Sequence, residues 1–461
     1  MKIAVIGVKG IPAKQGGIEH YCQELYPRIV AQGHEVDLFA RPSYTEKPWF
    51  SSYKHEGVRV ISLPSLPLRG LDAFFNSAFG AMVSLFGNYD IVHFHALGPS
   101  LFCWLPRLFT SARVVVTCQG LDWQRAKWGK LSSTLIRMGE KAAVKYAHEI
   151  AVVSKDLQAY FRNTYGIETD YISNAPGKYA ESDPKLSYSQ SLGLESGRYL
   201  LFLGRLVPEK RPELLLEAFQ KLQPKGWKLV LAGGNSDTTD YITKLENIAA
   251  GNPNVVFTGE LKGAKLAEIV RGTGLFVLPS DLEGLPLAML EAMREGVPVL
   301  ASDIPPHRQV IGKDEARGLL FKAGSMSSLL ESLKRAISEP QKLSEIAQKA
   351  QQHVRANHNW KKTTYENLAL YARIAGTGIK PVISKKIQTT DKQQRIQACL
   401  QELSSLLYED LLTQASTIKQ TTDQERLEHT LREQLSEKIN AQVELVLSDR
   451  LRKVQQVSLR K

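Results

Sequence analysis

The chain has 461 residues, of which 43% are hydrophobic and 23% are charged, and its formal net charge is +12. This composition is that of a globular protein, and it excludes a wholly disordered chain, a collagen-like repeat and a disulfide-rich mini-protein. At roughly 150 residues per domain, the length predicts about three structural units.

The basic excess lies in residues 1–380, because residues 381–461 contribute only +2. A basic body suits a nucleotide, a diphosphate or an anionic lipid surface, and a merely solvated surface is the alternative. No zinc-finger spacing or aromatic RNA-binding motif is present, so we expect no nucleic-acid partner. Scattered cysteines and the lack of a secretory leader or bilayer-length apolar run predict a cytoplasmic protein with reduced thiols.

Short apolar runs alternate with amphipathic stretches along the first half of this body, which is typical of parallel sheets with helical crossovers. A helix is predicted over Glu19–Ala31. The first set of predicted strands covers Lys2–Gly7, Glu35–Ala40, Val58–Ser62, Asp90–His93, Arg113–Cys118, Glu149–Val153 and Asp170–Ser173.

The first strand runs into a glycine-rich loop that contains Gly7, Gly10, Gly16 and Gly17. Glycines let the backbone approach a ligand and expose amide donors, and a plain turn is the alternative. Their spacing is not that of a dinucleotide-binding fingerprint, so we expect no nicotinamide cofactor.

Polar residues follow two later strands of this set. His93 and His95 share one strand face by alternation, and no third ligand is near them, so structural or acceptor-side roles are favoured over a metal site. The next predicted strand ends at Cys118 and is followed by Gln119 and Asp122. Asp122 is either a general base or a structural cap.

A stretch that is both aromatic and basic comes next. It suits a lipid headgroup surface or a lipid-diphosphate acceptor, and a solvated helix with buried tryptophans is the alternative. Its residues are Trp123, Arg125, Lys127, Trp128, Lys130, Arg137, Lys141 and Lys145.

Strand and helix signals lapse near 176–187, and a second set of strands follows, with helices over Pro212–Leu222 and Leu285–Glu295. Ligands of such sheets bind beyond the carboxyl ends of the strands, so two doubly wound domains predict one cleft between them. The strands are predicted over Tyr199–Gly204, Lys228–Ala232, Asn254–Thr258, Gly274–Pro279, Val297–Ser302 and Gly318–Phe321.

The first strand of the second set ends at Gly204 and is followed by Arg205 and Lys210. Cations at a strand end can neutralise charge that develops on a leaving nucleoside diphosphate without a metal. An ordinary surface ion pair is the alternative.

The most specific stretch is Asp281–Asp303, in which Glu283, Gly284 and Leu285 precede Pro286 at the expected first helical position. A helix start offers unpaired N–H groups and a partial positive charge to a diphosphate. Glu283 lies before that anion site and Glu291 beyond it. This placement suits hydroxyl groups on both sides of a diphosphate, those of a sugar and of a ribose.

After Pro381 glycine and proline vanish, and leucines recur at helical spacing. Capping-box patterns start at Thr390 and Thr422, which predicts two helices over 379–461. A hairpin docked on the protein's own body and self-association through these helices are both open.

The E-G-x-P-x-x-x-x-E frame at Glu283–Glu291 resembles the signature of family 4 glycosyltransferases of the GT-B fold, as does the Gly204–Lys210 segment. The resemblance covers about residues 1–378. Two segments, Gly7–His20 and Thr117–Gly129, are similar to the corresponding segments of a bacterial rhamnosyltransferase subgroup of this family. It implies an α/β fold of two Rossmann-like domains, at 1–180 and 181–358. A helix at 359–378 returns to the first domain, and the extension at 379–461 follows.

The resemblance also implies residue roles. Arg205 and Lys210 bind the donor diphosphate, Glu283 binds the donor sugar and Glu291 binds the ribose. The remaining donor-binding residues are Gly16, Gly17, Gly204, Gly284 and Leu285. Many family members carry histidine where this chain has Gln119. Glutamine does not titrate, so a histidine general base is absent there.

The expected activity is therefore transfer of a hexosyl or deoxyhexosyl group from a dTDP-, UDP- or GDP-sugar to a lipid-linked or glycan acceptor in polysaccharide synthesis. Rhamnose is the first candidate sugar. The resemblance also implies retention of configuration at the anomeric carbon, independence of metals and cofactors, and contact with the inner face of the cell membrane. A non-catalytic nucleotide-sugar-binding or scaffold protein and a nicotinamide oxidoreductase are the alternatives.

Overall fold

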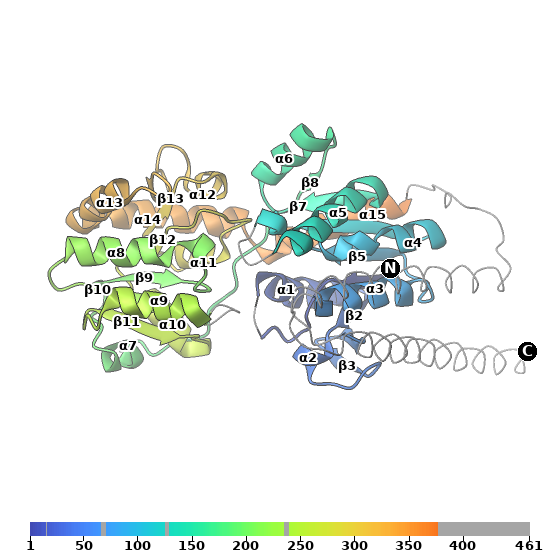
Figure 1. The fold of residues 1–461 in the computed structure, drawn as a ribbon, viewed down its shortest axis with the longest axis horizontal. Helices are drawn as coiled ribbons and strands as arrows, with labels where there is room; N and C mark the ends of the chain where they lie inside the picture. Colours follow the sequence, from blue (N-terminus) through green and yellow to red (C-terminus); the bar gives the residue numbers. More distant parts are fainter. Residues whose placement is uncertain (15, 66–70, 125–128, 235–238, 377–461) are drawn as a thin grey trace, which may run out of the picture. The chain divides into compact units, whose positions relative to one another are not determined.

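The computed structural model describes residues 1–14, 16–65, 71–124, 129–234 and 239–376 (Figure 1). Their strands form two sheets, of eight and six strands, and helices flank both sheets. The predicted α/β fold with two doubly wound domains is confirmed. The predicted helices of 379–461 lie outside the described residues, and the domain limits stay predictions.

The first sheet has the strand order β3-β4-β2-β1-β5-β6-β7-β8, and every neighbouring pair is parallel except β3 with β4. β3 was not predicted from the sequence. The central strands are buried along almost their whole length because helices cover both faces. The bounds are β1 Lys2–Ile6, β2 Glu35–Ala40, β3 Ser52–His55, β4 Val58–Ser62, β5 Ile91–His95, β6 Arg113–Cys118, β7 Glu149–Val152 and β8 Asp170–Tyr171.

Helices and helical turns connect these strands. α6 shows how the sequence sets their ends, because Ser154 caps its first turn and Gly166 ends it in the left-handed conformation. The bounds are α1 Gly17–Ala31, α2 Pro42–Thr45, α3 Leu71–Ser84, η1 Pro99–Phe102, α4 Trp104–Phe109, η2 Asp122–Gln124, α5 Lys130–Tyr146 and α6 Lys155–Tyr165.

The second sheet has the order β11-β10-β9-β12-β13-β14 and is parallel throughout. Its strands are β9 Tyr199–Leu203, β10 Lys228–Ala232, β11 Val255–Gly259, β12 Leu275–Leu278, β13 Val299–Ser302 and β14 Leu319–Phe321. The helices are α7 Ser187–Ser191, η3 Pro208–Lys210, α8 Pro212–Leu222, α9 Thr239–Ala249, α10 Gly263–Arg271, α11 Leu287–Arg294, α12 Pro305–Ile311, α13 Met326–Ser338 and α14 Pro340–Asn357.

The strand order places the ligand-binding loops. In the first sheet β1 lies between β2 and β5, and in the second β9 lies between β10 and β12. Connections leave in opposite directions on the two sides of β1 and of β9, and these are the points where such sheets bind ligands. The loops that begin at Gly7, Gly204 and Pro279 follow β1, β9 and β12.

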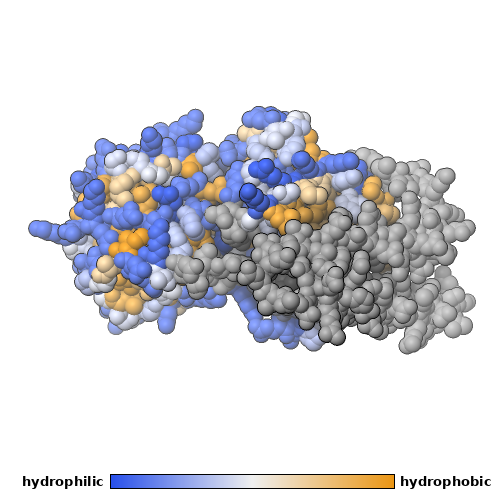
Figure 2. All heavy atoms as spheres, in the orientation of Figure 1, coloured by the Kyte–Doolittle hydropathy of each residue, from blue (hydrophilic) through white to orange (hydrophobic). Residues whose placement is uncertain are grey.

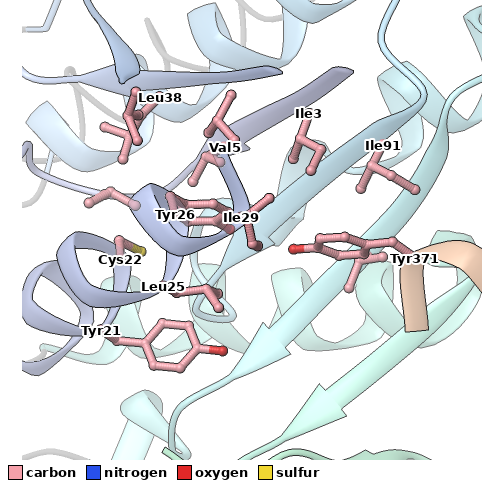
Figure 3. Close-up of a cluster of buried hydrophobic side chains, with 14 of the residues drawn as sticks. Ile3, Val5, Tyr21, Cys22, Leu25, Tyr26, Ile29, Leu38, Ile91 and Tyr371 are labelled. Atoms are coloured by element: carbon pink, nitrogen blue, oxygen red, sulfur yellow. The ribbon is translucent and has the colours of Figure 1, made fainter. Parts of the chain in front are cut away.

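The last described helix, α15 (Trp360–Gly376), packs on the first domain. Leu370, Tyr371 and Ile374 are buried in the same cluster as residues of β1, β2 and α1. Figure 3 shows Tyr371 reaching this cluster beside Ile91 and Ile29. The chain therefore enters the second domain after β8 and comes back to complete the core of the first.

On the face drawn in Figure 2, both hydrophilic residues and groups of hydrophobic residues are visible among the described residues. No described helix has the length and hydrophobicity needed to span a bilayer. Cys22, Cys103 and Cys118 are buried free thiols, and Cys399 lies outside the described residues.

Candidate active site

The centre of the candidate site is an ion pair between two loops of the second domain. Lys210 ends η3 after β9, and its Nζ lies 2.6 Å from Oε1 of Glu283, in the loop after β12. The Ser280 hydroxyl donates to the same Glu283 oxygen at 2.9 Å. Both charged side chains are largely buried, at 16% and 12% exposure, so the pair is shielded from water. Two predicted residues are thus in direct contact.

Burial alone raises the pKa of Glu283, but the Lys210 ammonium and the Ser280 hydroxyl together hold this pKa below its usual value. Glu283 is therefore charged at neutral pH. His307 lies in α12, and burial lowers its pKa to about 4, so its imidazole is neutral. The Nδ1 atom of His307 is 2.8 Å from the Ser302 carbonyl oxygen, and its buried Nε2 finds no partner among the described residues.

Glu291 lies one turn into α11, facing the segment that connects the two sheets. Its Oε2 accepts a hydrogen bond from the Tyr179 hydroxyl at 3.0 Å, and its Oε1 accepts one from the Gly177 N–H at 3.3 Å. Burial raises the pKa of Glu291 to about 7, although these two donors and Arg294 pull it down. The two glutamates of the frame therefore differ in charge state near neutral pH.

Pro286 occupies the N-cap of α11, so the expected first helical position is held by Leu287. The reason is local, because the ψ of 80° at Pro286 is not helical. Leu285 is 8% exposed beside it.

The loop before α11 touches the first domain. A Cβ added to Gly284 would lie 1.9 Å from the Gln119 carbonyl oxygen, so only glycine permits this approach of the two backbones. The Gln119 side chain accepts a hydrogen bond from Asn174 Nδ2 at 2.8 Å, and its buried Nε2 has no partner among the described residues. Sequence-predicted residues of both domains therefore meet at Gly284.

The glycine-rich loop after β1 also approaches α11. Gly16 has a φ of 101°, and a Cβ there would lie 2.1 Å from Oε2 of the buried Glu19. A Cβ on Gly17, the first residue of α1, would lie 3.7 Å from Cδ1 of Leu287. Glu19 Oε1 accepts from the Lys9 N–H at 3.2 Å, which ties the loop to its helix.

Arg205 directly follows Gly204 at the end of β9 and is half-buried. Asp122 begins η2, and its N–H donates to the Gly120 carbonyl at 3.0 Å. The next residue, Trp123, donates its indole N–H to the buried Glu140 at 2.9 Å, so this tryptophan has a structural contact. Arg125, Lys127 and Trp128 lie outside the described residues.

The histidine pair of β5 is part of the core. His93 Nδ1 lies 2.6 Å from the Tyr371 hydroxyl, and His95 Nε2 lies 2.6 Å from the Tyr26 hydroxyl. Burial lowers the pKa of both rings, that of His95 to about 3. These contacts indicate a structural role for His93 and His95, which is one of the two roles predicted for them; the other was a role on the acceptor side. No group of three or more residues suited to a metal occurs among the described residues.

Four residues of the site were missed from the sequence: Asn174, Gly177, Tyr179 and Ser280. Asn174 directly follows the last predicted strand of the first set, and Gly177 and Tyr179 lie in the stretch without strand or helix signals. The partners of all three are 55 to 114 residues away in the chain. Ser280 directly follows the predicted strand and precedes Glu283 by three residues, a spacing that does give a signal.

Comparisons with known proteins assign each domain to a family. Residues 16–175 match the glycosyl transferase 4-like domain, and residues 185–353 match glycosyl transferases group 1. The chain is 26% identical to a D-inositol 3-phosphate glycosyltransferase of Rhodococcus erythropolis over 82% of this chain and 93% of that protein. It is 25% identical to an uncharacterized glycosyltransferase of Methanocaldococcus jannaschii over 80% and 98%.

Solved structures agree on the fold. Sucrose-phosphate synthase from Thermosynechococcus elongatus superposes with a TM-score of 0.71 at 23% identity, covering 81% of this chain and 98% of that one. HepE from Anabaena, in complex with UDP, gives a TM-score of 0.65 at 19% identity, covering 81% and 100%. With these two family domains in succession on the GT-B architecture, the chain belongs to the glycosyltransferases and is a transferase enzyme.

Proposed function

We propose that this glycosyltransferase moves a sugar from a nucleotide-diphosphate donor to an acceptor hydroxyl, and that its donor site lies around the start of α11. The observation that carries the proposal is the placement of Glu283 and Glu291 on either side of that helix start, with Lys210 hydrogen-bonded to Glu283. Helix starts favour anions, and charged carboxylates accept hydrogen bonds from hydroxyl groups. The HepE structures that resemble this chain contain UDP or UDP-glucose.

In this proposal Arg205 and Lys210 face the diphosphate, Glu283 the sugar and Glu291 the ribose. Gly16, Gly17, Gly204, Gly284 and Leu285 line the backbone around the donor. Two buried nitrogens without partners among the described residues, Gln119 Nε2 and His307 Nε2, support a polar ligand here, because an unpaired buried donor or acceptor costs about 1–3 kcal/mol.

We further propose transfer with retention and without a metal. Lys210, already placed beside Glu283, can stabilise the leaving diphosphate, whose phosphate oxygen then takes the acceptor proton. Asp122 is the alternative base. Rhamnose from dTDP-rhamnose is the first candidate sugar, with UDP- and GDP-sugars next.

The acceptor is proposed to be a lipid-linked precursor or glycan of a surface polysaccharide, reached at the inner face of the cell membrane. α5 supports this location, because it exposes Leu131 and Met138 among Lys130, Arg137 and Lys141. A phosphorylated polyol is a second candidate acceptor, favoured by the relatives named D-inositol 3-phosphate glycosyltransferase.

A ligand panel tests the donor site. A ligand that binds only the folded state at 100 times its Kd adds about 2.7 kcal/mol of stability. We expect UDP, GDP or dTDP, and the matching UDP-glucose, GDP-mannose or dTDP-rhamnose, to raise the melting temperature, while NAD(H) leaves it unchanged. No shift with any nucleotide contradicts the donor site. Binding without turnover on any acceptor favours the scaffold alternative.

A further inference from the structure

The segment that connects the two sheets holds both oxygens of one carboxylate. The Tyr179 hydroxyl donates to Glu291 Oε2 at 3.0 Å and the Gly177 N–H to Oε1 at 3.3 Å. Tyr179 is 9% exposed, so its ring is fixed by packing, whereas Glu291 is only half-buried. Each carboxylate oxygen therefore has one donor from this segment, and part of the Glu291 side chain remains exposed.

The same segment is fixed to the second domain and to α15. Arg294, one turn after Glu291 in α11, donates to the carbonyl oxygens of Pro176 at 3.2 Å and Gly177 at 3.4 Å. The indole N–H of Trp360 donates to the Pro176 carbonyl at 3.2 Å. Three side-chain hydrogen bonds thus immobilise the backbone that carries Gly177 and Tyr179.

A carboxylate has about four lone-pair positions on its two oxygens, so one donor on each oxygen leaves room for two more. The ribose of UDP or GDP offers two neighbouring hydroxyl donors, which matches this remaining capacity, whereas the deoxyribose of dTDP offers its 3′-hydroxyl alone. The Tyr179 hydroxyl and the Gly177 N–H fix the plane of the carboxylate before a ligand binds. Ligand binding therefore does not have to restrict the rotation of this group, which lowers the entropic cost of binding.

We propose that Tyr179 is a positioning residue, which orients the Glu291 carboxylate so that its remaining lone pairs accept the ribose hydroxyls of the donor nucleotide. This inference rests on the proposed role of Glu291 in the donor site. It adds that ribose recognition depends on the segment between the two domains.

The charge state of Glu291 provides a second readout. Burial raises the pKa of Glu291 to about 7, and the Tyr179 hydroxyl, the Gly177 N–H and Arg294 lower it from what burial alone would give. Glu295 and Arg271 face Tyr179 and are paired with each other at 2.8 Å, while Arg355 of α14 donates to the Arg294 carbonyl. Removing the Tyr179 hydroxyl should therefore raise the pKa of Glu291 and weaken ribose binding most near neutral pH.

The experiment compares Tyr179→Phe with wild-type protein by calorimetric titration between pH 6 and pH 9. The probes are whichever of UDP, GDP and dTDP binds wild type most tightly, and the 2′,3′-dideoxy form of that nucleotide. We expect Tyr179→Phe to weaken binding of the normal nucleotide about 3- to 10-fold at pH 7, the effect of one hydrogen bond, and less at pH 9. Binding of the dideoxy form should change less than twofold.

Two controls separate positioning from loss of structure. Tyr188→Phe removes a hydroxyl from α7, just after the same segment, and should change neither affinity. In a Glu291→Gln background, Tyr179→Phe should no longer alter the preference for the ribose hydroxyls or the pH profile.

An equal loss for both nucleotides, or no loss in Tyr179→Phe, overturns the positioning role while leaving the donor site intact. Wild-type protein that binds none of the three nucleotides overturns the proposed donor site as well. Wild-type protein that binds both forms equally overturns the ribose role of Glu291, and the positioning role with it.

Discussion

The two glutamates of the α11 frame show how surroundings set the chemistry of identical side chains. Glu283 has a cation at 2.6 Å, and its pKa lies below the usual value despite its burial. Glu291 is in contact with neutral donors, and burial raises its pKa to about 7. A permanently charged carboxylate suits a sugar site beside cations, and a carboxylate that titrates near neutrality makes nucleotide binding depend on pH.

Replacing Lys210 by methionine tests the ion pair. We expect turnover to fall about 30- to 1000-fold, because a cation that stabilises developing charge is worth about 2–4 kcal/mol of barrier. The pKa of Glu283 should rise, because its largest favourable partner is lost while its burial remains. Steady-state kinetics measure the turnover, and thermal melting as a function of pH reports the change in the pKa of Glu283.

Two companion variants make this result interpretable. Lys221→Met removes an exposed lysine from α8 and should alter neither turnover nor melting. Lys210→Met with Glu283→Gln should recover stability, because no charge remains buried without a partner, but not activity. Near-normal turnover in Lys210→Met would remove this lysine from the proposed site.

At the residue scale, the sequence reveals contacts between neighbouring loops better than contacts between distant segments. Lys210 and Glu283 carry a recognisable spacing after predicted strands, and they are in contact. Tyr179 carries no local pattern, since its importance comes from Glu291, 112 residues later in the chain. The backbone contact of Gln119 with Gly284 is equally long-range, so neither motif alone predicts it.

At the scale of elements, β5 is unusual because its buried face carries two histidines. The rings of His93 and His95 stack at 4.3 Å, and hydroxyl groups of α1 and α15 are within hydrogen-bonding distance of them. A second polar contact, from Asn367 to the Tyr21 hydroxyl at 3.0 Å, lies between the same two helices. This buried polar network therefore fixes α15 against β5 and α1, in addition to the apolar packing around Tyr371.

Neutral buried histidines make the protein less stable in acid. The folded pKa of His95 is about 3, whereas the unfolded pKa is near the ordinary 6.5, so the unfolded chain binds the extra proton between these values. Stability is thus present above pH 6.5 and is lost as the pH falls below it. One such histidine lowers the free energy of unfolding by about 2 kcal/mol at pH 5 relative to pH 7.

We therefore expect the melting temperature of wild type to be lower at pH 5 than at pH 7, and the difference to shrink in His95→Gln. The substitution will lower stability at both values, so the informative quantity is the change between them. His20→Gln, which removes an exposed histidine of α1, should leave that change as it is. An unaltered pH dependence in His95→Gln would show that this ring does not carry the effect.

Element positions were readable from the sequence because buried parallel strands are continuous apolar runs, such as Tyr199–Leu203 and Leu275–Leu278. Ser52–His55 was missed because this edge strand has no apolar run and pairs antiparallel with β4. The shifted start of α11 depends on the backbone of Pro286, which residue type alone does not determine.

At the scale of the whole molecule, the first domain is assembled from two distant parts of the chain. Strands and helices up to β8 supply the sheet, and α15 returns after about 190 residues to bury Leu370, Tyr371 and Ile374 at 4%, 0% and 5% exposure. The second domain is thus inserted between two parts of the chain that both belong to the first domain. Its connecting segment contacts Gln119, Glu291 and Trp360, which belong to both domains and to the returning helix.

Truncation tests whether α15 completes the folded body. A chain of residues 1–378 retains every core contact described for α15, and we expect it to stay soluble and to melt within a few degrees of the full chain. A chain of residues 1–358 exposes the surface that α15 covers, where three buried apolar side chains contribute about 1.5–3 kcal/mol each. We expect this chain to aggregate or to melt well below the longer one.

Point variants in the full chain separate loss of packing from loss of length. Leu370→Ala should destabilise by about 2–5 kcal/mol, because Leu370 is 4% exposed, whereas Tyr365→Ala on the same helix should have little effect at 72% exposure. Thermal melting and the soluble fraction after expression measure all four proteins. If residues 1–378 behave like residues 1–358, the core of the body includes residues 379–461, and α15 does not close it.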